Sequence, residues 1–302
     1  MSKKSLQFEL WQQCNSHCKY CYLGPEALLT PDHLKIKNLN SVYDKISDLS
    51  NYAEYDILSF IGGEFFQGQL NTPEIESLFF KLMDKVHWLM MNGYVKTVWL
   101  CATLTIGEQK HLYQLLDMFK DLPSATEPNE GFWICTSYDT IGRFHSPRML
   151  ENWNYHMHNI HEKYPNIKFN TTMILTQDLI TKFLNNEFSF TDFGKEHNTP
   201  FFFKQPAPGH FGSNGSPEGK LKMEAHLPGF FPKRADFTKF LWKFKNENPE
   251  LFDHLFNIKY RADDLYRNFN DDQKLMILNH RYKDCKDETN IAGENATNKC
   301  GH

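Results

Sequence analysis

The sequence predicts an α/β fold: an open, partial TIM-like barrel of six β/α units, followed by a mostly helical C-terminal extension. Short apolar runs alternate with longer segments such as 73–92, in which apolar residues recur at helical spacing. Such alternation indicates parallel strands joined by right-handed helical crossovers. The 302 residues, of which 40% are hydrophobic, are enough for one large domain with a sizeable core.

Strand and helix signals follow one another in order through the first two thirds of the chain. Each strand is a short apolar run such as YDILSFI or VKTVWLCA, and strands are expected at 6–11, 55–61, 95–102, 132–138, 168–175 and 200–205. Helices are expected between them at 31–49, 73–92, 107–120, 147–163 and 177–186.

Three regions follow from this pattern. Residues 1–206 form the predicted core, and 207–234, which begins rich in glycine, proline and serine, is predicted as a loop or linker. Residues 235–302 form the predicted helical extension with a cysteine-containing tail. Its first helix, 235–247, has Phe237, Phe240, Leu241 and Phe244 on one face and is expected to pack against the core. Two further helices are expected near 248–257 and 260–279.

Composition narrows the possible functions. The net charge of −4 argues against broad electrostatic binding to nucleic acid. No apolar run reaches the roughly 20 residues needed to cross a bilayer. The odd number of cysteines, seven, and the lack of a secretory signal argue against disulfides. We therefore expect a soluble cytoplasmic protein with reduced thiols.

Three cysteines directly after the first strand form the most informative motif. Cys14, Cys18 and Cys21 have C-x3-C-x2-C spacing, and the next cysteine is Cys101. Three thiolates can bind three corners of a four-iron cluster and leave the fourth iron open, whereas structural clusters normally take four cysteines. An open metal position is typical of catalytic sites, by analogy with zinc. The alternatives are zinc with His17, which directly precedes Cys18 and is poorly placed, or three unconnected thiols.

A second motif, Gly62-Gly63-Glu64, directly follows the strand expected at 55–61. Alone it would indicate an ordinary glycine turn. Together with the cysteine motif and Tyr20 before the third cysteine, it resembles the radical S-adenosylmethionine (radical SAM) superfamily. The resemblance implies the same partial barrel. In such barrels the chemistry lies at the carboxyl ends of the strands, where both motifs are expected.

The resemblance also implies a cofactor and a cosubstrate site. Cys14, Cys18 and Cys21 would bind a [4Fe-4S] cluster, and Tyr20 would lie near the adenine of S-adenosylmethionine (SAM). The segment Gly62-Gly63-Glu64 would receive the amino group of SAM through carbonyl and carboxylate oxygens.

The run after the fourth strand carries a further resemblance. Ser137, Asp139, His145 and Arg148 are similar to the S-x-D…H…R run of the SPASM/twitch-type branch, which includes sulfatase-maturing and peptide-modifying enzymes. This implies that Ser137, Asp139 and Arg148 belong to the SAM site, with Ser137 and Arg148 holding its ribose and carboxylate. Thr140 stands where the branch usually has glycine. Asp139 could instead cap a turn, and Arg148 the following helix.

Thr103, after the third strand, is a further candidate for ribose binding. The activity implied by the resemblance is reductive cleavage of SAM. An external one-electron reductant of the flavodoxin or ferredoxin type would supply the electron. The 5′-deoxyadenosyl radical would then abstract hydrogen from a peptide, protein or small-molecule substrate. The run 137–148 slightly favours a peptide.

Two other functions stay open. The chain could modify a nucleotide or nucleic acid, which local basic spots such as Lys233-Arg234 allow but the bulk charge does not support. It could also be a non-catalytic iron–sulfur sensor or regulator, although a sensor has no need of Gly62-Gly63-Glu64. Because the first strand begins by residue 6, we expect neither a leader-peptide-binding nor a cobalamin domain before it.

The polar tail contains Cys285 and Cys300. Enzymes of the resembled branch often carry an auxiliary cluster or metal there. Two cysteines are too few for a four-thiolate site, so His280 or His302 would have to contribute. Free surface thiols are the alternative.

Overall fold

The protein is built around an open, parallel β-sheet. The computed structural model describes residues 4–21, 30–51, 55–123, 130–204, 217–256 and 288–292. Within these residues seven strands lie in the order β6-β5-β4-β3-β2-β1-β7, and each neighbouring pair is parallel. They are β1 (Lys4–Glu9), β2 (Tyr55–Ile61), β3 (Thr97–Cys101), β4 (Gly131–Tyr138), β5 (Ile167–Ile174), β6 (Phe201–Lys204) and β7 (Glu288–Ala292). The predicted α/β class is confirmed.

Helices connect the strands from β1 to β6. They are α1 (Asp32–Ser47), α2 (Pro73–Met91), α3 (Lys110–Phe119), α4 (Pro147–Lys163), α5 (Gln177–Leu184) and α6 (Phe190–Glu196), with a 3₁₀ turn η2 (Asp48–Asn51) after α1. All but α6 and η2 match predicted helices to within a few residues. Local signals account for the start of α2. The Thr72 hydroxyl accepts from the N–H of Ile75 at 3.3 Å, and Pro73 is the first residue of the helix.

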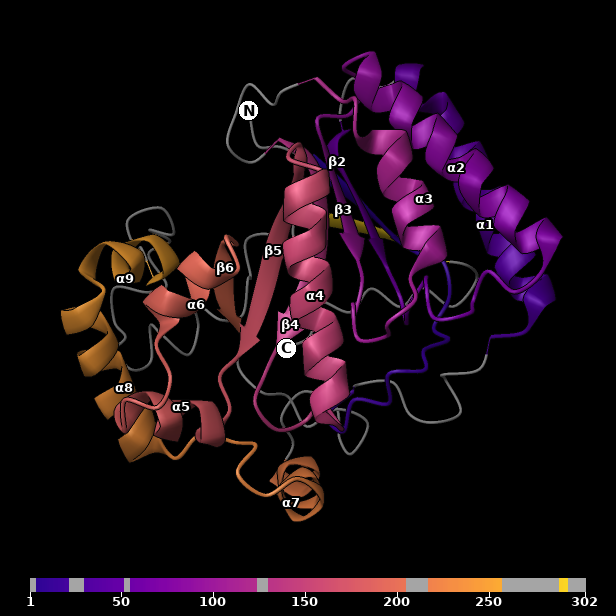
Figure 1. Cartoon of the computed structure of the whole chain (residues 1–302). Coiled ribbons are helices and arrows are strands. Elements are labelled where there is room, and N and C mark those ends of the chain that lie inside the picture. The colour runs from indigo at the N-terminus through magenta and orange to yellow at the C-terminus, as the bar shows by residue number, and fades with distance from the viewer. Residues whose placement is uncertain are drawn as a thin grey trace.

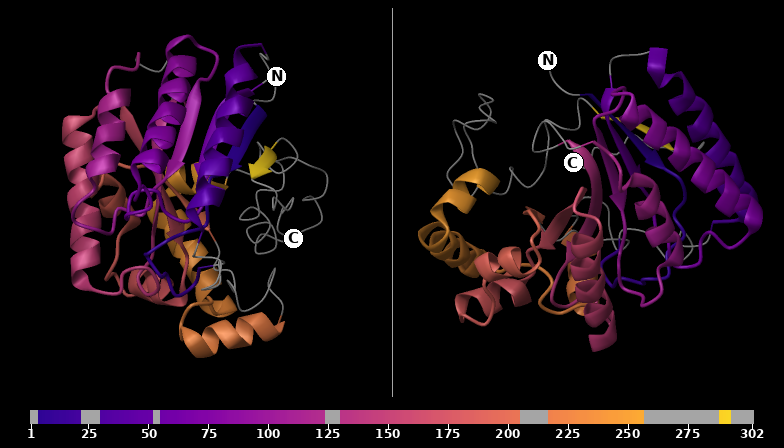
Figure 2. Two further views of the ribbon diagram at one scale, coloured as in Figure 1. Left: turned by 90° about the vertical axis from the view of Figure 1, so that its right-hand side faces the viewer. Right: turned by 45° about the horizontal axis from the view of Figure 1, so that its top comes forward.

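The order of the strands determines where the helices lie. From β1 to β6 each strand lies beside its predecessor, so successive right-handed crossovers put their helices on the same face of the sheet. Helices α1 to α4 accordingly cover one face (Figure 1) and stand side by side in the first view of Figure 2. The carboxyl ends of the strands therefore lie along one edge of the sheet. The cysteine loop after β1, the Gly-Gly-Glu turn after β2 and the loop after β4 all begin at this edge.

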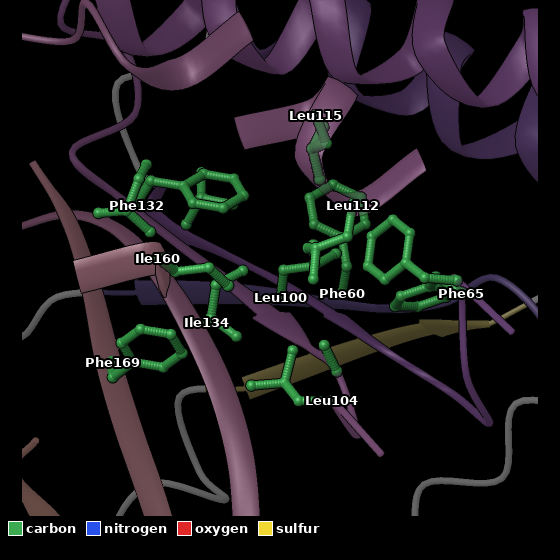
Figure 3. Close-up of a cluster of buried hydrophobic side chains, with 14 of the residues drawn as sticks. Phe60, Phe65, Leu100, Leu104, Leu112, Leu115, Phe132, Ile134, Ile160 and Phe169 are labelled. Carbon is green, nitrogen blue, oxygen red and sulfur yellow. The ribbon is translucent and has the colours of Figure 1, made fainter. Parts of the chain in front are cut away.

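The core fills the space between the sheet and these helices. Along β4, Phe132 and Ile134 are fully buried, whereas Trp133 and Cys135, which alternate with them, are half-buried on the other face. Figure 3 shows strand residues such as Phe60 and Ile134 in a cluster of buried side chains that also includes Leu112 of α3. Each fully buried side chain of this size contributes roughly 1.5–3 kcal/mol.

The segment predicted as a loop or linker, 207–234, contains a helix, so that prediction is wrong over α7 (Pro217–His226). Met223 of α7 and the adjacent Leu227 and Phe230 bury their side chains against Ile174 at the end of β5. The Glu224 carboxylate accepts from the backbone N–H groups of residues 229 and 231 at 2.8 and 3.3 Å, which holds the turn after α7.

Helices α8 (Arg234–Glu247) and α9 (Pro249–Phe256) confirm the helical start of the extension. Phe240 and Phe244 of α8 pack against Phe183 and Phe190, as predicted, and belong to the same cluster of buried side chains as the strands. The strand β7 was not expected in the extension, and it pairs beside β1. The extension therefore shares the core of 1–206. The helix predicted at 260–279 lies outside the described residues.

No helix in the described ranges combines the length and apolar character needed to cross a membrane.

Candidate functional site

The cysteine loop, residues 12–21, leaves the carboxyl end of β1. Cys14, Cys18 and Cys21 are half-buried, and none of the three forms a disulfide. The N–H of Cys21 donates to the carbonyl of Cys18 at 3.0 Å, which folds the second half of the loop into a turn. The N–H of Ser16 points at the sulfur of Cys14 at 3.4 Å. These local bonds gather the three cysteines on one compact loop.

The glycines after β2 are required by close backbone approach. The N–H of Gly63 donates to the carbonyl of Trp11, and that of Glu64 to the carbonyl of Gln13, both at 2.9 Å. A Cβ on Gly62 would lie 2.2 Å from the Trp11 oxygen, and a Cβ on Gly63 would lie 2.1 Å from the Gln13 oxygen. Gly62 also has φ +152°, which side chains rarely adopt. The Gly-Gly turn thus supports the backbone of the cysteine loop.

Glu64 is a fully buried brace. Its Oε1 accepts from the N–H groups of Phe65 and Phe66 at 2.9 and 3.1 Å, and its Oε2 accepts from the N–H of Thr103 at 2.6 Å. Its backbone carbonyl accepts from the indole N–H of Trp11 at 2.8 Å. A carboxylate offers about four acceptor positions. These three bonds leave about one for a ligand.

Gln67 joins the cysteine loop to the end of β3. Its Nε2 lies 2.9 Å from the hydroxyl of Ser16, 2.8 Å from that of Thr103 and 3.1 Å from that of Thr105. Its backbone carbonyl accepts from the side chain of Asn15 at 2.8 Å. The Thr103 hydroxyl predicted as a ribose ligand is therefore engaged in this buried network. Nothing in the sequence singled out Gln67, because its partners come from two distant segments.

The loop after β4 holds the other side of the cysteine loop. The Asp139 carboxylate accepts from the N–H groups of Ile141, Gly142 and Arg143 at 3.0, 2.5 and 3.2 Å, so it caps a turn, the alternative left open by the sequence. The hydroxyl of Tyr20 donates to the same carboxylate at 2.6 Å. These bonds fix the turn after β4 against Tyr20, the residue that precedes Cys21.

Two further contacts join the same loops. The N–H of Lys19 donates to the carbonyl of Gly142 at 2.9 Å, and the His145 ring lies 3.0 Å from the carbonyl of Ser16. A Cβ on Gly142 would lie 2.3 Å from the Tyr20 ring, so glycine is required where the two loops meet. The predicted residues Tyr20, Asp139 and His145 are thus brought together with the cysteines.

Tyr20 also carries a stacked partner. Its ring packs on Phe230 with centroids 5.5 Å apart and planes 14° apart, and it borders the small cluster formed by the α7 region. Burial, reinforced by Asp139, holds the pKa of Tyr20 well above its usual value, so its hydroxyl stays protonated and donates. One ring face is therefore covered.

The other predicted ligands are placed differently. Ser137 is half-buried at the carboxyl end of β4, on the face of the sheet opposite α1–α4. Arg148 is exposed on the first turn of α4. Cys285, Cys300, His280 and His302 lie outside the described residues.

Arg143 is a charged residue of this site that sequence reasoning missed. It is only 7% exposed and lies close enough to Cys14 and Cys18 to lower the pKa of each thiol. Burial disfavours its charge, but Cys18, Tyr20 and Asp139 raise its pKa, and its side chain is hydrogen-bonded to Tyr20. The run 137–148 contained this arginine two positions before His145, but the spacing of the run pointed to Arg148.

Burial raises the pKa of the Cys14 and Cys18 thiols, which keeps them protonated. It raises the pKa of Cys18 to about 12, against the opposing effect of Arg143 and together with Cys14, Asp139 and Cys21. It also raises the pKa of Cys14 above its usual value. Thiolates are the metal-binding form. A metal that binds here must displace these protons, so its uptake releases protons.

The donor set fits an iron–sulfur cluster. Three thiols share one loop, and soft thiolates are the ligands such clusters take. Among the described side chains, no three His, Cys, Asp or Glu residues converge on a single ion position. A four-iron cube does not require such convergence, because each thiolate binds a different iron. Cys14, Cys18 and Cys21 are the residues that would hold it.

Comparison with known proteins does not assign this chain to a family. No protein-family model matches the sequence, and no curated protein matches it significantly.

Proposed function

We propose that this chain is a radical SAM enzyme whose [4Fe-4S] cluster is held by Cys14, Cys18 and Cys21. The observation that carries the proposal is the number of separate contacts that hold the cysteine loop. Backbone N–H groups of the Gly-Gly-Glu turn, the Gln67 side chain and the loop after β4 all bond to it. Such supporting contacts fix the position of metal ligands before the metal binds.

The open sheet supports the proposal at the level of the fold. Sequential parallel strands with their helices on one face are the arrangement of (β/α) barrels, and we propose that this sheet is a partial (β/α)6 barrel. The cysteine loop, the Gly-Gly-Glu turn and the loop after β4 all begin at the carboxyl ends of strands. Barrel enzymes place their chemistry at this edge.

When bound, the cluster supplies the electron that splits SAM into methionine and a 5′-deoxyadenosyl radical, which takes hydrogen from the substrate. The chain's residues hold and orient the reactants. The remaining acceptor position of Glu64 and the adjacent glycine carbonyls suit the amino group of SAM. The Ser137 hydroxyl is the best-placed ribose ligand, since that of Thr103 is already bonded. Tyr20 would border the adenine.

We propose that the substrate binds on the face of the sheet opposite α1–α4. Cys101 lies on this face near the end of β3. Burial raises the pKa of Cys101 to about 11, Glu64 adds to the rise, and Lys204 and Arg143 oppose it. Glu64 after β2, Arg143 after β4 and Lys204 of β6 therefore all lie near Cys101. We propose that a peptide, protein or small molecule binds there, with a flavodoxin- or ferredoxin-type protein as the electron donor.

The proposal is tested with anaerobically reconstituted protein. We expect about four irons per chain, and formation of 5′-deoxyadenosine after addition of dithionite and SAM. Cys14→Ala, Cys18→Ala and Cys21→Ala should each lose both, whereas Cys135→Ala, which removes a thiol from β4, should keep both. Wild-type protein that binds no iron would refute the proposal.

The same experiment separates the alternatives. Four irons without 5′-deoxyadenosine would indicate a sensor or regulator. Deuterium transferred from a labelled peptide, small molecule or nucleotide into 5′-deoxyadenosine would identify the substrate class. Iron in excess of about four that disappears in Cys285→Ala and Cys300→Ala would indicate a second metal site in the tail.

A further inference from the structure

Arg143 is a buried cation with an unused hydrogen-bond donor. It is 7% exposed, its backbone N–H is bound to Asp139 at 3.2 Å, and its guanidinium is hydrogen-bonded to Tyr20. Its Nε is buried without a hydrogen-bond partner in the described part of the chain. A guanidinium has five N–H donors and stays charged in proteins, so burial without full pairing is costly.

The carboxylate of Asp139 has no acceptor position left for this N–H. Asp139 already accepts three backbone N–H groups and the Tyr20 hydroxyl. The buried Nε–H of Arg143 is therefore left for an acceptor that the described residues do not provide.

The backbone shows where that acceptor lies. Lys19, which directly follows Cys18, donates its N–H to Gly142, which directly precedes Arg143. This main-chain bond holds the backbone next to Arg143 against the cysteine loop. The guanidinium acts electrostatically on Cys14 and Cys18, which come from opposite halves of that loop.

We propose that Arg143 is the counter-charge of the cluster site: its guanidinium balances the negative charge of the thiolate-bound cluster and donates its unused N–H to the cluster's sulfur atoms. This inference rests on the proposed function. Net charge and hydrogen bonds to sulfur are the main protein controls on the potential of such clusters. Because a reduced cluster is more negative by one charge, Arg143 stabilises the reduced form and raises the reduction potential.

The test compares three variants without SAM, so that the readout is independent of catalysis. Arg143→Gln removes the charge, Arg143→Lys keeps it, and Arg234→Gln removes the same charge from the exposed start of α8. Each protein is reconstituted anaerobically, its iron and sulfide are counted, and its cluster is titrated with a reductant and followed by electron paramagnetic resonance.

In Arg143→Gln we expect the ratio of reduced to oxidised cluster, at the wild-type midpoint, to fall at least about tenfold. For one electron this is a shift of about 59 mV to lower potential. Arg143→Lys should stay near the wild type, and Arg234→Gln should match it. Loss of iron in a folded Arg143→Gln, with full iron in Arg143→Lys, would also support the inference.

Three outcomes would overturn it. Full iron with an unchanged potential in Arg143→Gln would show that the charge is not used. Equal defects in Arg143→Gln and Arg143→Lys, including failure of both to fold, would show that Arg143 is only a structural brace for Tyr20. Wild-type protein without iron would remove the proposed function itself, whereas an iron-loaded wild type with unaltered variants removes only the role of Arg143.

Discussion

Gly63→Ala tests whether the Gly-Gly turn supports the cysteine loop. The added Cβ would lie 2.1 Å from the carbonyl oxygen of Gln13 and 2.3 Å from that of Gln12. Both are backbone atoms, and real Cβ atoms essentially never approach closer than 3.0 Å. The cysteine loop must therefore move away by roughly 1 Å, since overpacked sites relieve contacts by shifts of the backbone.

The expected cost is that of a tightly overpacked site, about 1–3 kcal/mol. In a chain of this size each kcal/mol lowers the melting temperature by roughly 2–4 °C. The same shift misplaces Cys14, which directly follows Gln13. We therefore expect Gly63→Ala to melt several degrees lower and to retain less than half of the wild-type iron after reconstitution.

The matched control is Gly107→Ala in the loop after β3. Its Cβ would meet only the Asn152 side chain at 3.5 Å, an ordinary contact. Thermal melting followed by circular dichroism and colorimetric iron analysis measure both effects. If Gly63→Ala and Gly107→Ala melt together and bind equal iron, the close approach does not hold the loop and the reasoning is wrong.

Three further predictions follow from the same site. Tyr20→Phe removes the 2.6 Å hydrogen bond to Asp139. It should lower the free energy of unfolding, measured by urea titration, by about 1–3 kcal/mol. A change below about 0.5 kcal/mol would contradict this prediction. Gln67→Leu leaves the buried hydroxyls of Ser16, Thr103 and Thr105 without this partner. The iron retained after reconstitution should therefore fall although the fold persists. Full iron retention would show that this hydrogen-bond network does not hold the cysteine loop. Cys18 has a pKa raised by burial from 9.0 to about 12, so its contribution to the stability of metal-free protein is complete below pH 9 and is lost as the pH rises toward 12. Melting of wild type should therefore fall more steeply above pH 9 than that of Cys18→Ala, and parallel curves would refute the assignment.

Much of the fold was predictable because its signals are local. Apolar runs such as 55–61 and the helical spacing in 73–92 gave the correct strands and helices, since each pattern depends on neighbours in the chain. Two elements that the sequence did not predict, α7 and β7, depend on contacts with distant residues. Helix α7 packs in the same buried cluster as Ile174 through Met223, and β7 pairs with β1.

The sequence by itself determined the chemistry that is present: three closely spaced thiols after one strand and a Gly-Gly-Glu turn after the next. Only the tertiary structure decided what surrounds them. Tyr20 and Asp139, 119 residues apart, meet in one hydrogen bond, and this meeting brings Arg143 rather than Arg148 to the cysteines. The physical reason is that burial and charge pairing arise from packing between segments, which no local spacing of residues encodes.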